Sequence, residues 1–249
     1  MIILKSRSEI EKMRKSNAIV AVILEELRKK IRPGVKTIEL DRLSEELALK
    51  KGARPAFKGY RGYPYSLCAS VNSEVVHGMP SDKELKEGDI VSLDFGILND
   101  GYYGDAAVTV PVGEITPAAK RLLRVTEEAL YRGIAEVKAG NRIGDISAAI
   151  QGHVEAAGYS VVRDLVGHGI GKSLHEDPQV PNYGSSGRGV ELKPGMVFAI
   201  EPMVNEGTYR VEILRDGWTV VTADGKLSAH FEHSVAITEN GPVILSRIG

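Results

Sequence analysis

The feature that most constrains this 249-residue chain is an internal repeat, because the second half follows the order of the first. Gly34 and Gly52 each lie 106 positions before a matching glycine, Gly140 and Gly158. Farther along, residues 84–94 (ELKEGDIVSLD) align with residues 191–201 (ELKPGMVFAIE) at an offset of 107. A duplicated segment of this kind folds twice into the same supersecondary unit, so we expect two similar halves.

Each half begins with a pattern typical of two helices. Ser6 and Glu9 form a predicted capping box before a run of apolar residues with helical spacing, which Pro33-Gly34 ends. A second helix is predicted from about residue 37 to 51. Thr116-Pro117 starts the same order again, as an N-cap followed by proline at the first helical position. Each half is therefore expected to supply a long helix and a shorter one.

Strands are predicted between the pairs of helices. Apolar residues alternate over residues 91–95 and 198–200, and short turns with glycine, such as residues 99–101, separate such segments. The chain is therefore predicted to have an α+β fold, in which two halves, about 1–112 and 113–249, pack about a pseudo-twofold axis and share one curved sheet. Because no linker rich in Pro, Gly or Ser lies near residues 111–120, we expect residues 1–249 to form a single domain.

Composition excludes several classes of protein. The 32 Lys and Arg residues nearly balance the 33 Asp and Glu residues, so no basic field draws the chain to nucleic acid. The single cysteine, Cys68, cannot form an intrachain disulfide, which favours a reducing compartment and predicts a cytoplasmic protein. No run of about 18 apolar residues occurs, so we expect no membrane segment.

Four carboxylates occupy equivalent positions in the repeat, with Asp94 matching Glu201 and Asp105 matching Glu232. On a strand, residues two apart share a face, and each carboxylate has a small residue two positions away. Burying such a group is costly without a cation, and no Lys or Arg stands two positions from any of the four. A lone Asp or Glu is ordinarily a solvent-facing residue or a turn cap. The duplication favours a metal site instead.

His168 is the best candidate among the six histidines for a nitrogen ligand, because flanking glycines allow close backbone approach. The alternative is a histidine that merely belongs to a Gly-rich turn. His77 and His175 also lie in loop-like segments. His230 and His233 flank the last of the four carboxylates, and each has either a role in the site or only a structural one.

Two other motifs have competing interpretations. Residues 167–173 (GHGIGKS) resemble a phosphate-binding loop, but Val166 stands where that motif requires a glycine. Cys68 is either a nucleophile or a buried pocket residue. Its apolar neighbours, Leu67 and Ala69, favour the buried role.

Taken together, these motifs resemble those of the bacterial-type (type I) methionine aminopeptidases over essentially the whole chain. The matching segments are Asp94 and Asp105 in that order, residues 167–171 (GHGIG), 175–178 (HEDP), 200–202 (IEP) and 231–233 (FEH). The resemblance implies the pita-bread fold, a curved antiparallel sheet covered by two pairs of helices. It also implies a metallo-exopeptidase that removes the initiator methionine from nascent proteins whose second residue is small.

The resemblance implies two divalent metal ions per chain, with Co, Mn, Fe and Zn as candidates and the native metal undecided. Asp94 would chelate one ion, His168 and Glu201 would bind the other, and Asp105 and Glu232 would bridge the two. Glu201 would also act as general acid and base while an activated water attacks the peptide bond.

His77 and His175 would contact the substrate at the scissile bond and, with Glu201, make up the catalytic residues. The pocket for the methionine side chain would be lined by Tyr60, Tyr63, Cys68 and Trp218, with Phe57 and Leu174 alongside. Phe57 and Leu174 differ from the Cys and Phe of some relatives, which bears on the shape of the pocket and not on the metal ligands.

Two rival functions share the implied fold. A proline-specific peptidase uses the same five types of metal ligand, and a non-enzymatic peptide-binding module typically loses some of them. The expected partners are the N-terminal methionine of nascent polypeptides and the ribosome near its exit tunnel. The chain is expected to be a monomer.

Overall fold

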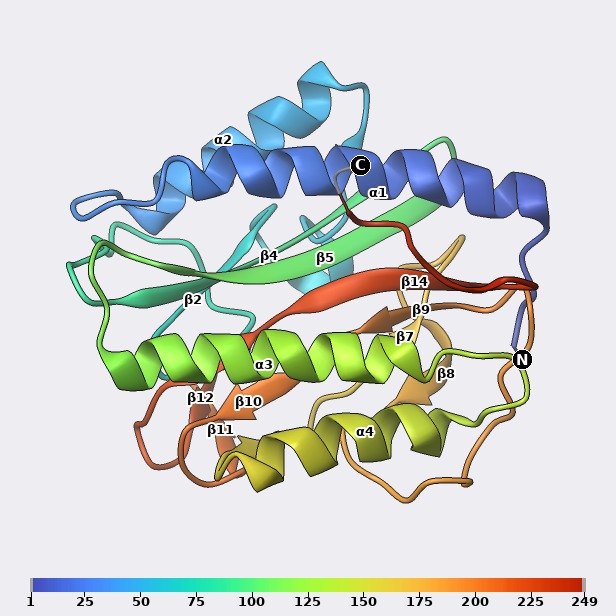
Figure 1. The fold of residues 1–249 in the computed structure, drawn as a ribbon. Coiled ribbons are helices and arrows are strands. Elements are labelled where there is room, and N and C mark those ends of the chain that lie inside the picture. The colour runs from blue at the N-terminus through green and yellow to red at the C-terminus, as the bar shows by residue number, and fades with distance from the viewer. Residues whose placement is uncertain (1, 248–249) are drawn as a thin grey trace.

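The computed structural model describes residues 2–247. Four long helices lie over one face of a curved sheet (Figure 1). The helices are α1 (Arg7–Arg28), α2 (Thr37–Lys50), α3 (Pro117–Ala135) and α4 (Ile143–Ala156). In this view α1 and α2 cover one part of the sheet, and α3 and α4 cover the other. The predicted α+β fold with two pairs of helices is confirmed.

Local capping explains where α1 and α3, the longer helix of each half, begin. The backbone N–H of Glu9 donates to the Ser6 hydroxyl at 3.3 Å, and the Glu9 carboxylate accepts from the Ser6 backbone N–H at 2.9 Å. This is the predicted capping box. At the start of α3, the hydroxyl of Thr116 accepts from the N–H of Ala119 at 3.1 Å, and Pro117 occupies the first helical position as predicted.

The repeat is visible in individual backbone hydrogen bonds. The N–H of Gly34 donates to the carbonyl of Leu85 at 2.8 Å, and the N–H of Gly140 donates to the carbonyl of Leu192 at 3.0 Å. Both glycines adopt left-handed backbone conformations, with φ of 85° and 90°. A residue with a Cβ rarely adopts this conformation, which is why glycine recurs at both places.

The main sheet contains nine of the described strands. Its order is β1-β4-β5-β14-β9-β7-β8, with β15 paired to β14 and β2 paired to β4. The bounds are β1 (Arg54–Pro55), β2 (Cys68–Val71), β4 (Ile90–Asn99), β5 (Tyr102–Pro111), β7 (Gly167–Gly169), β8 (Glu176–Val180), β9 (Val197–Ile200), β14 (Glu232–Thr238) and β15 (Gly241–Ile244). The strands of the two halves meet where β5 pairs antiparallel with β14.

Two smaller sheets and one short helix complete the described fold. One small sheet has the order β13-β10-β6, from strands Ser228–His230, Met203–Asn205 and Ser160–Val161. The other has the order β11-β12-β3, from strands Val211–Ile213, Val220–Thr222 and Glu74–Val76. A 3-10 helix, η1, spans Tyr60–Gly62. None of the described helices combines the length and apolar character that crossing a membrane requires.

The two faces of the sheet differ in chemistry, as the alternation predicts. On β4, Val91, Leu93, Phe95 and Ile97 are fully buried in a core shared with α1 and α2. A second core joins α3 and α4 to strands of the other half. Because successive strand residues point to opposite faces, Asp94 lies on the face turned away from these helices.

Candidate active site

The strand register brings three of the four predicted carboxylates together. Asp94 on β4 and Glu232 on β14 are both direct cross-strand neighbours of Ala107 on β5. Asp105 lies two positions before Ala107 and therefore shares its face. Directly opposed residues on neighbouring strands have Cβ atoms only about 4.5–5.5 Å apart. The small side chain of Ala107 thus leaves a space with a carboxylate on each side of it.

The remaining two predicted ligands come from the next strands of the sheet. His168 on β7 is paired with Ala199 on β9, and Glu201 follows two positions later, directly after β9 ends. His168 Nε2 lies 3.6 Å from Glu201 Oε1. Asp105, His168 and Glu232 each offer one ligand atom within 4.8 Å of the others. The structure therefore brings all five predicted ligand residues to one place on the sheet.

Several of these buried oxygens have no hydrogen-bond partner. Asp94 Oδ1, Asp105 Oδ1 and Glu232 Oε1 are buried and unpaired. Within residues 2–247, no Lys or Arg forms an ion pair with any of the three side chains. A buried carboxylate without a partner is strongly destabilising, whereas a divalent cation binds oxygen ligands of this kind. The donor set therefore fits a metal ion.

Burial controls the protonation of the carboxylates in the absence of a metal. Loss of hydration raises the pKa of Asp94 to about 7 and that of Glu201 to about 8. The pKa values of Asp105 and Glu232 rise well above their usual range, first because of burial and then because of the neighbouring carboxylates. A bound cation would oppose both effects, since it favours the ionised form.

His168 has the protonation state that a ligand needs. Burial lowers the pKa of its imidazole to about 4, so the ring is neutral near pH 7. Its Nδ1–H donates to the carbonyl of Gly169 at 2.9 Å. The lone pair of Nε2 therefore faces Glu201 and the metal site.

A glycine on β4 leaves room beside the carboxylates. A Cβ at Gly96 would lie 2.8 Å from Phe57 Cε1 and 3.1 Å from Asp105 Oδ1. Both distances are shorter than ordinary carbon contacts, which are about 3.5–4.0 Å. Gly96, two positions after Asp94, therefore leaves space beside the acidic groups that a larger residue would fill.

A pocket opens next to the carboxylates, and every predicted site residue lines it. Its lining includes Phe57, Tyr60, Tyr63, Cys68, His77, Asp94, Asp105, His168, Leu174, His175, Glu201, Trp218 and Glu232. The Tyr63 and Trp218 rings meet edge to face with centroids 5.1 Å apart. The Tyr63 hydroxyl is held by the carbonyls of Leu67 and Gly78 at 3.0 and 3.2 Å. These contacts fix the position of the Tyr63 ring in the aromatic wall.

Cys68 is a buried residue in the wall of the pocket. It is paired with Asp94 across β2 and β4 and is buried. Burial, followed by the charge of Asp94, raises the pKa of its thiol well above the usual range. Because the thiolate is the reactive form, the raised pKa disfavours a nucleophile and favours the buried-pocket interpretation.

The two other predicted histidines also line the pocket. His175 lies beside His168, with ring centroids 4.2 Å apart, and its Nδ1 is 2.8 Å from the hydroxyl of Tyr60. His77 follows β3 in a left-handed conformation, with φ of 58°, and its ring is 6.4 Å from that of Trp218. Burial lowers the pKa of His77 to about 4 and that of His175 to about 3, so both rings are neutral near pH 7.

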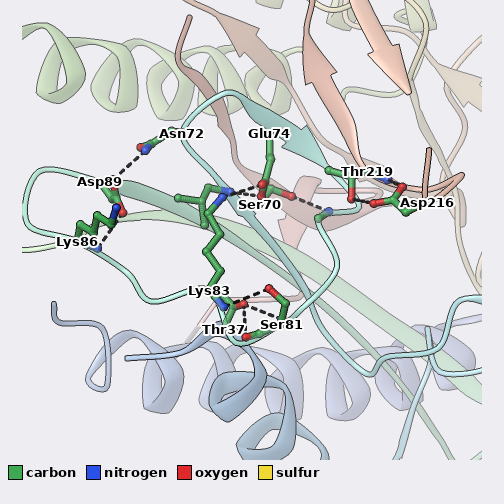
Figure 2. Close-up of polar contacts among 12 residues, drawn as sticks. Thr37, Ser70, Asn72, Glu74, Ser81, Lys83, Lys86, Asp89, Asp216 and Thr219 are labelled. Atoms are coloured by element: carbon green, nitrogen blue, oxygen red, sulfur yellow. Dashed lines mark hydrogen bonds and ion pairs between the residues drawn. The ribbon is translucent and has the colours of Figure 1, made fainter. Parts of the chain in front are cut away.

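Polar contacts hold the turns that carry His77 and Trp218, and Figure 2 shows those made by Ser70, Asp216 and Thr219. The hydroxyl of Ser70 accepts from the N–H of Gly78 at 3.0 Å, directly after His77. The carboxylate of Asp216 accepts from the N–H of Trp218 at 2.8 Å and from the hydroxyl of Thr219 at 2.7 Å. His77 and Trp218 therefore project from loops that hydrogen bonds stabilise.

Sequence reasoning missed part of the site. The additional lining residues are Arg61, Val76, Leu165, Val166 and Met203. Met203 could have been found from its spacing, because it stands two positions after Glu201. His233, next to Glu232, points away from the pocket, and its Nδ1 is 2.8 Å from the hydroxyl of Ser246. Of the two histidines left open, His233 has a structural role, and His230 lies 3.5 Å from Glu201.

The fold and this site define a class: a pita-bread metallopeptidase with an acidic centre beside an aromatic pocket. Residues 11–239 match the model of metallopeptidase family M24. A methionine aminopeptidase of Clostridium perfringens is 58% identical over 248 residues, with all of both chains covered. Methionine aminopeptidase 1 of Bacillus subtilis is 55% identical, again with all of both chains covered. The chain belongs to the methionine aminopeptidases of family M24.

Solved structures agree with this assignment. The methionine aminopeptidase of Thermotoga maritima matches with a TM-score of 0.98 at 55% identity, and all of both chains is covered. The prolidase of Pyrococcus furiosus matches with a TM-score of 0.80 at 26% identity, over 99% of this chain and 66% of that chain. The predicted pita-bread fold is confirmed, and neither rival function is favoured. Membership of family M24 also implies that the chain binds divalent metal.

Proposed function

We propose that this chain removes the N-terminal methionine from polypeptides by hydrolysing their first peptide bond. The main support for the proposal is that the five candidate metal-ligand side chains line the same pocket as a group of aromatic and sulfur-containing residues. A thioether makes favourable contacts with aromatic rings, so the pocket suits a methionine side chain. Tyr63, Trp218 and Cys68 would form its wall, with Phe57 and Leu174 alongside.

The proposed metal centre holds two divalent ions. Asp94 would bind one ion, His168 and Glu201 the other, and Asp105 and Glu232 would bridge them. The central position of Asp105 between β4 and β14 supports the bridging role. Co, Mn, Fe and Zn all suit a donor set with one imidazole and several carboxylates. When bound, such ions lower the pKa of water and polarise a carbonyl group.

Glu201 is the proposed general acid and base. Its carboxylate is deeply buried, and burial alone accounts for its raised pKa in the absence of metal. A carboxylate with little hydration readily accepts a proton from the attacking water and passes it to the leaving amine. Glu201 directly follows β9, and this strand places its backbone beside His168.

His175 is proposed to stabilise negative charge on the carbonyl oxygen of the substrate. Its ring is neutral, and the Tyr60 hydroxyl, 2.8 Å from Nδ1, is proposed to donate to that nitrogen. The proton of the ring would then lie on Nε2, which would be a donor toward the pocket. A fixed donor aimed at developing charge lowers the barrier without reorganisation. His77, also neutral, is proposed to assist near the nitrogen of the scissile bond.

Peptide hydrolysis with added Mn²⁺ or Co²⁺ tests the proposed activity. We expect cleavage of Met-Ala-Ser and none of Ala-Pro-Ala. Cleavage of the proline peptide alone would instead identify a proline-specific peptidase. Failure to cleave either peptide with any metal would support a binding module.

Two variants test the proposed roles. Glu201→Gln keeps the shape of the side chain but removes the base, so we expect a steep loss of turnover; near-normal turnover at normal metal content would refute the role. Asp105→Ala should abolish binding of the second ion, measured as metal content by mass spectrometry. Asp82→Ala, at an exposed residue, is the control. A fully active Asp105→Ala protein with two ions would refute the bridge.

The proposed substrate is a nascent polypeptide whose second residue is small. Contact with the ribosome near its exit tunnel and a monomeric state remain predictions. We also propose that residues 1–249 act as one catalytic domain, because ligands from both halves are needed for the site. Asp94 and Asp105 come from one half, and His168, Glu201 and Glu232 come from the other.

A further inference from the structure

His230 is a buried histidine beside the metal site with no assigned role. It lies on β13, and its exposed fraction is 1%. Among the described residues, neither of its ring nitrogens has a hydrogen-bond partner. Its Nε2 lies 3.5 Å from Glu201 Oε2. A buried imidazole without any partner is destabilising, so this placement requires an explanation.

The backbone of His230 is held in place by the side chain of Thr109 on β5. The hydroxyl of Thr109 donates to the carbonyl of His230 at 2.7 Å and accepts from its N–H at 2.9 Å. The hydroxyl of Ser92 lies 2.9 Å from the same Thr109 oxygen. Ser92 and Thr109 stand two positions from Asp94 and Ala107, on the face that carries the carboxylates. The position of the imidazole is therefore coupled to the ligand strands.

The two histidines beside Glu201 differ in what their nitrogens can do. His168 donates from Nδ1 to the carbonyl of Gly169, so its Nε2 presents a lone pair to Glu201 Oε1. Two electron-rich atoms at this distance repel each other unless a proton or a metal cation lies between them. The Nδ1 of His230 has no such carbonyl, so its Nε2 is free to carry the proton and donate to Glu201 Oε2.

We propose that His230 is a positioning residue for Glu201: its Nε2–H donates to Oε2 and keeps Oε1 directed at His168 and the metal. The separation of 3.5 Å is slightly longer than an ordinary N–H···O bond of about 2.7–3.2 Å, so the proposed hydrogen bond requires a small side-chain rotation. Residues that orient a metal ligand in this way typically change metal affinity or activity by about 10–100-fold. The inference rests on the proposed ligand and acid-base role of Glu201.

The test is calorimetric titration of metal-free protein with Mn²⁺, combined with kcat and KM for Met-Ala-Ser. We expect His230→Leu to weaken Mn²⁺ binding or lower kcat by about 10–100-fold, with little change in KM. His230→Gln retains an N–H donor and should recover most of the loss. His153→Ala, on α4 and outside the pocket, is the control and should match the wild type.

Two results would overturn the inference: wild-type Mn²⁺ affinity and kcat in His230→Leu, or no recovery in His230→Gln. If a variant fails to fold, ¹⁵N NMR of the wild type loaded with Zn²⁺ reports the tautomer directly, and a proton on Nδ1 of His230 would refute the proposal. The calorimetric titration needs no turnover. A protein that binds Mn²⁺ but does not hydrolyse Met-Ala-Ser would therefore contradict the proposed function, while the Mn²⁺ affinities of the variants could still be compared.

Discussion

The hydroxyl of Tyr60 lies 2.8 Å from Nδ1 of His175, and the two rings stack with their centroids 5.3 Å apart. These residues are 115 positions apart in the chain. Tyr60 is at once a wall of the proposed methionine pocket and the partner of a proposed catalytic histidine. Side-chain recognition and charge stabilisation are therefore linked through one hydroxyl.

Tyr60→Phe should lower kcat up to about tenfold and leave KM for a methionine peptide nearly unchanged. The variant keeps the aromatic wall but removes a hydrogen bond, which is typically worth about 0.5–1.5 kcal/mol. Steady-state kinetics on Met-Ala-Ser would measure both constants. Tyr131→Phe is a matched control, because Tyr131 contacts His233 on the other face of the sheet. A rise in KM with unchanged kcat would contradict the proposed link.

Gly96→Ala should weaken metal binding and reduce stability by about 1–3 kcal/mol, because the added methyl would overpack the site. Its Cβ would approach both Phe57 and Asp105. The matched control is Gly152→Ala on α4, where a Cβ meets nothing within 4 Å. In a helix this change is stabilising by about 0.5–1 kcal/mol. Urea unfolding and metal titration should separate the two variants; equal effects would refute the steric argument.

Lys5→Met should destabilise the fold by about 3–5 kcal/mol, because it leaves the charge of Glu176 buried and unpaired. Lys5 Nζ lies 2.6 Å from Glu176, and their side chains are only 4% and 7% exposed. Lys29→Met, which breaks an exposed pair with Glu26, should have little effect. Guanidinium unfolding measures both. A small change in the free energy of unfolding for Lys5→Met would show that the ion pair with Glu176 does not anchor the segment beside His175.

The metal-free protein should lose stability as the pH rises from about 6.5 to about 8. The folded-state pKa values of Asp94 and Glu201, about 7 and about 8, lie above their usual values of 3.8 and 4.5. The folded state therefore binds more protons than the unfolded state, and this contribution disappears as the pH passes the raised values. His77 and His168 act in the opposite sense, but their contribution is complete above their usual pKa of 6.5.

Thermal unfolding of chelator-treated protein at about pH 6.5 and about pH 8.5 would measure this dependence. Glu201→Gln cannot ionise at this position, so its unfolding temperature should fall less over the same range. An unfolding temperature that stays constant or rises with pH in the metal-free wild type would contradict the prediction.

Much of the fold could be predicted because its information is local and duplicated. The capping box at Ser6, the proline after Thr116 and the repeated glycines all depend on neighbouring residues, so they mark helix starts and turns without knowledge of the tertiary structure. The duplication also singled out Asp94, Asp105, Glu201 and Glu232. Family resemblance then supplied the pocket residues, all of which line one cavity.

The amino-acid sequence alone thus establishes the repeat, the α+β fold and the candidate ligands. The folded chain adds the strand register, which places Asp94 and Glu232 on either side of Ala107, directs His230 toward Glu201 and turns His233 to the opposite face. A periodicity of two tells which residues share a face of one strand, but not which strands are neighbours. The adjacency of β5 and β14 depends on hydrogen bonds between segments more than 100 residues apart, and it becomes visible only in the three-dimensional structure.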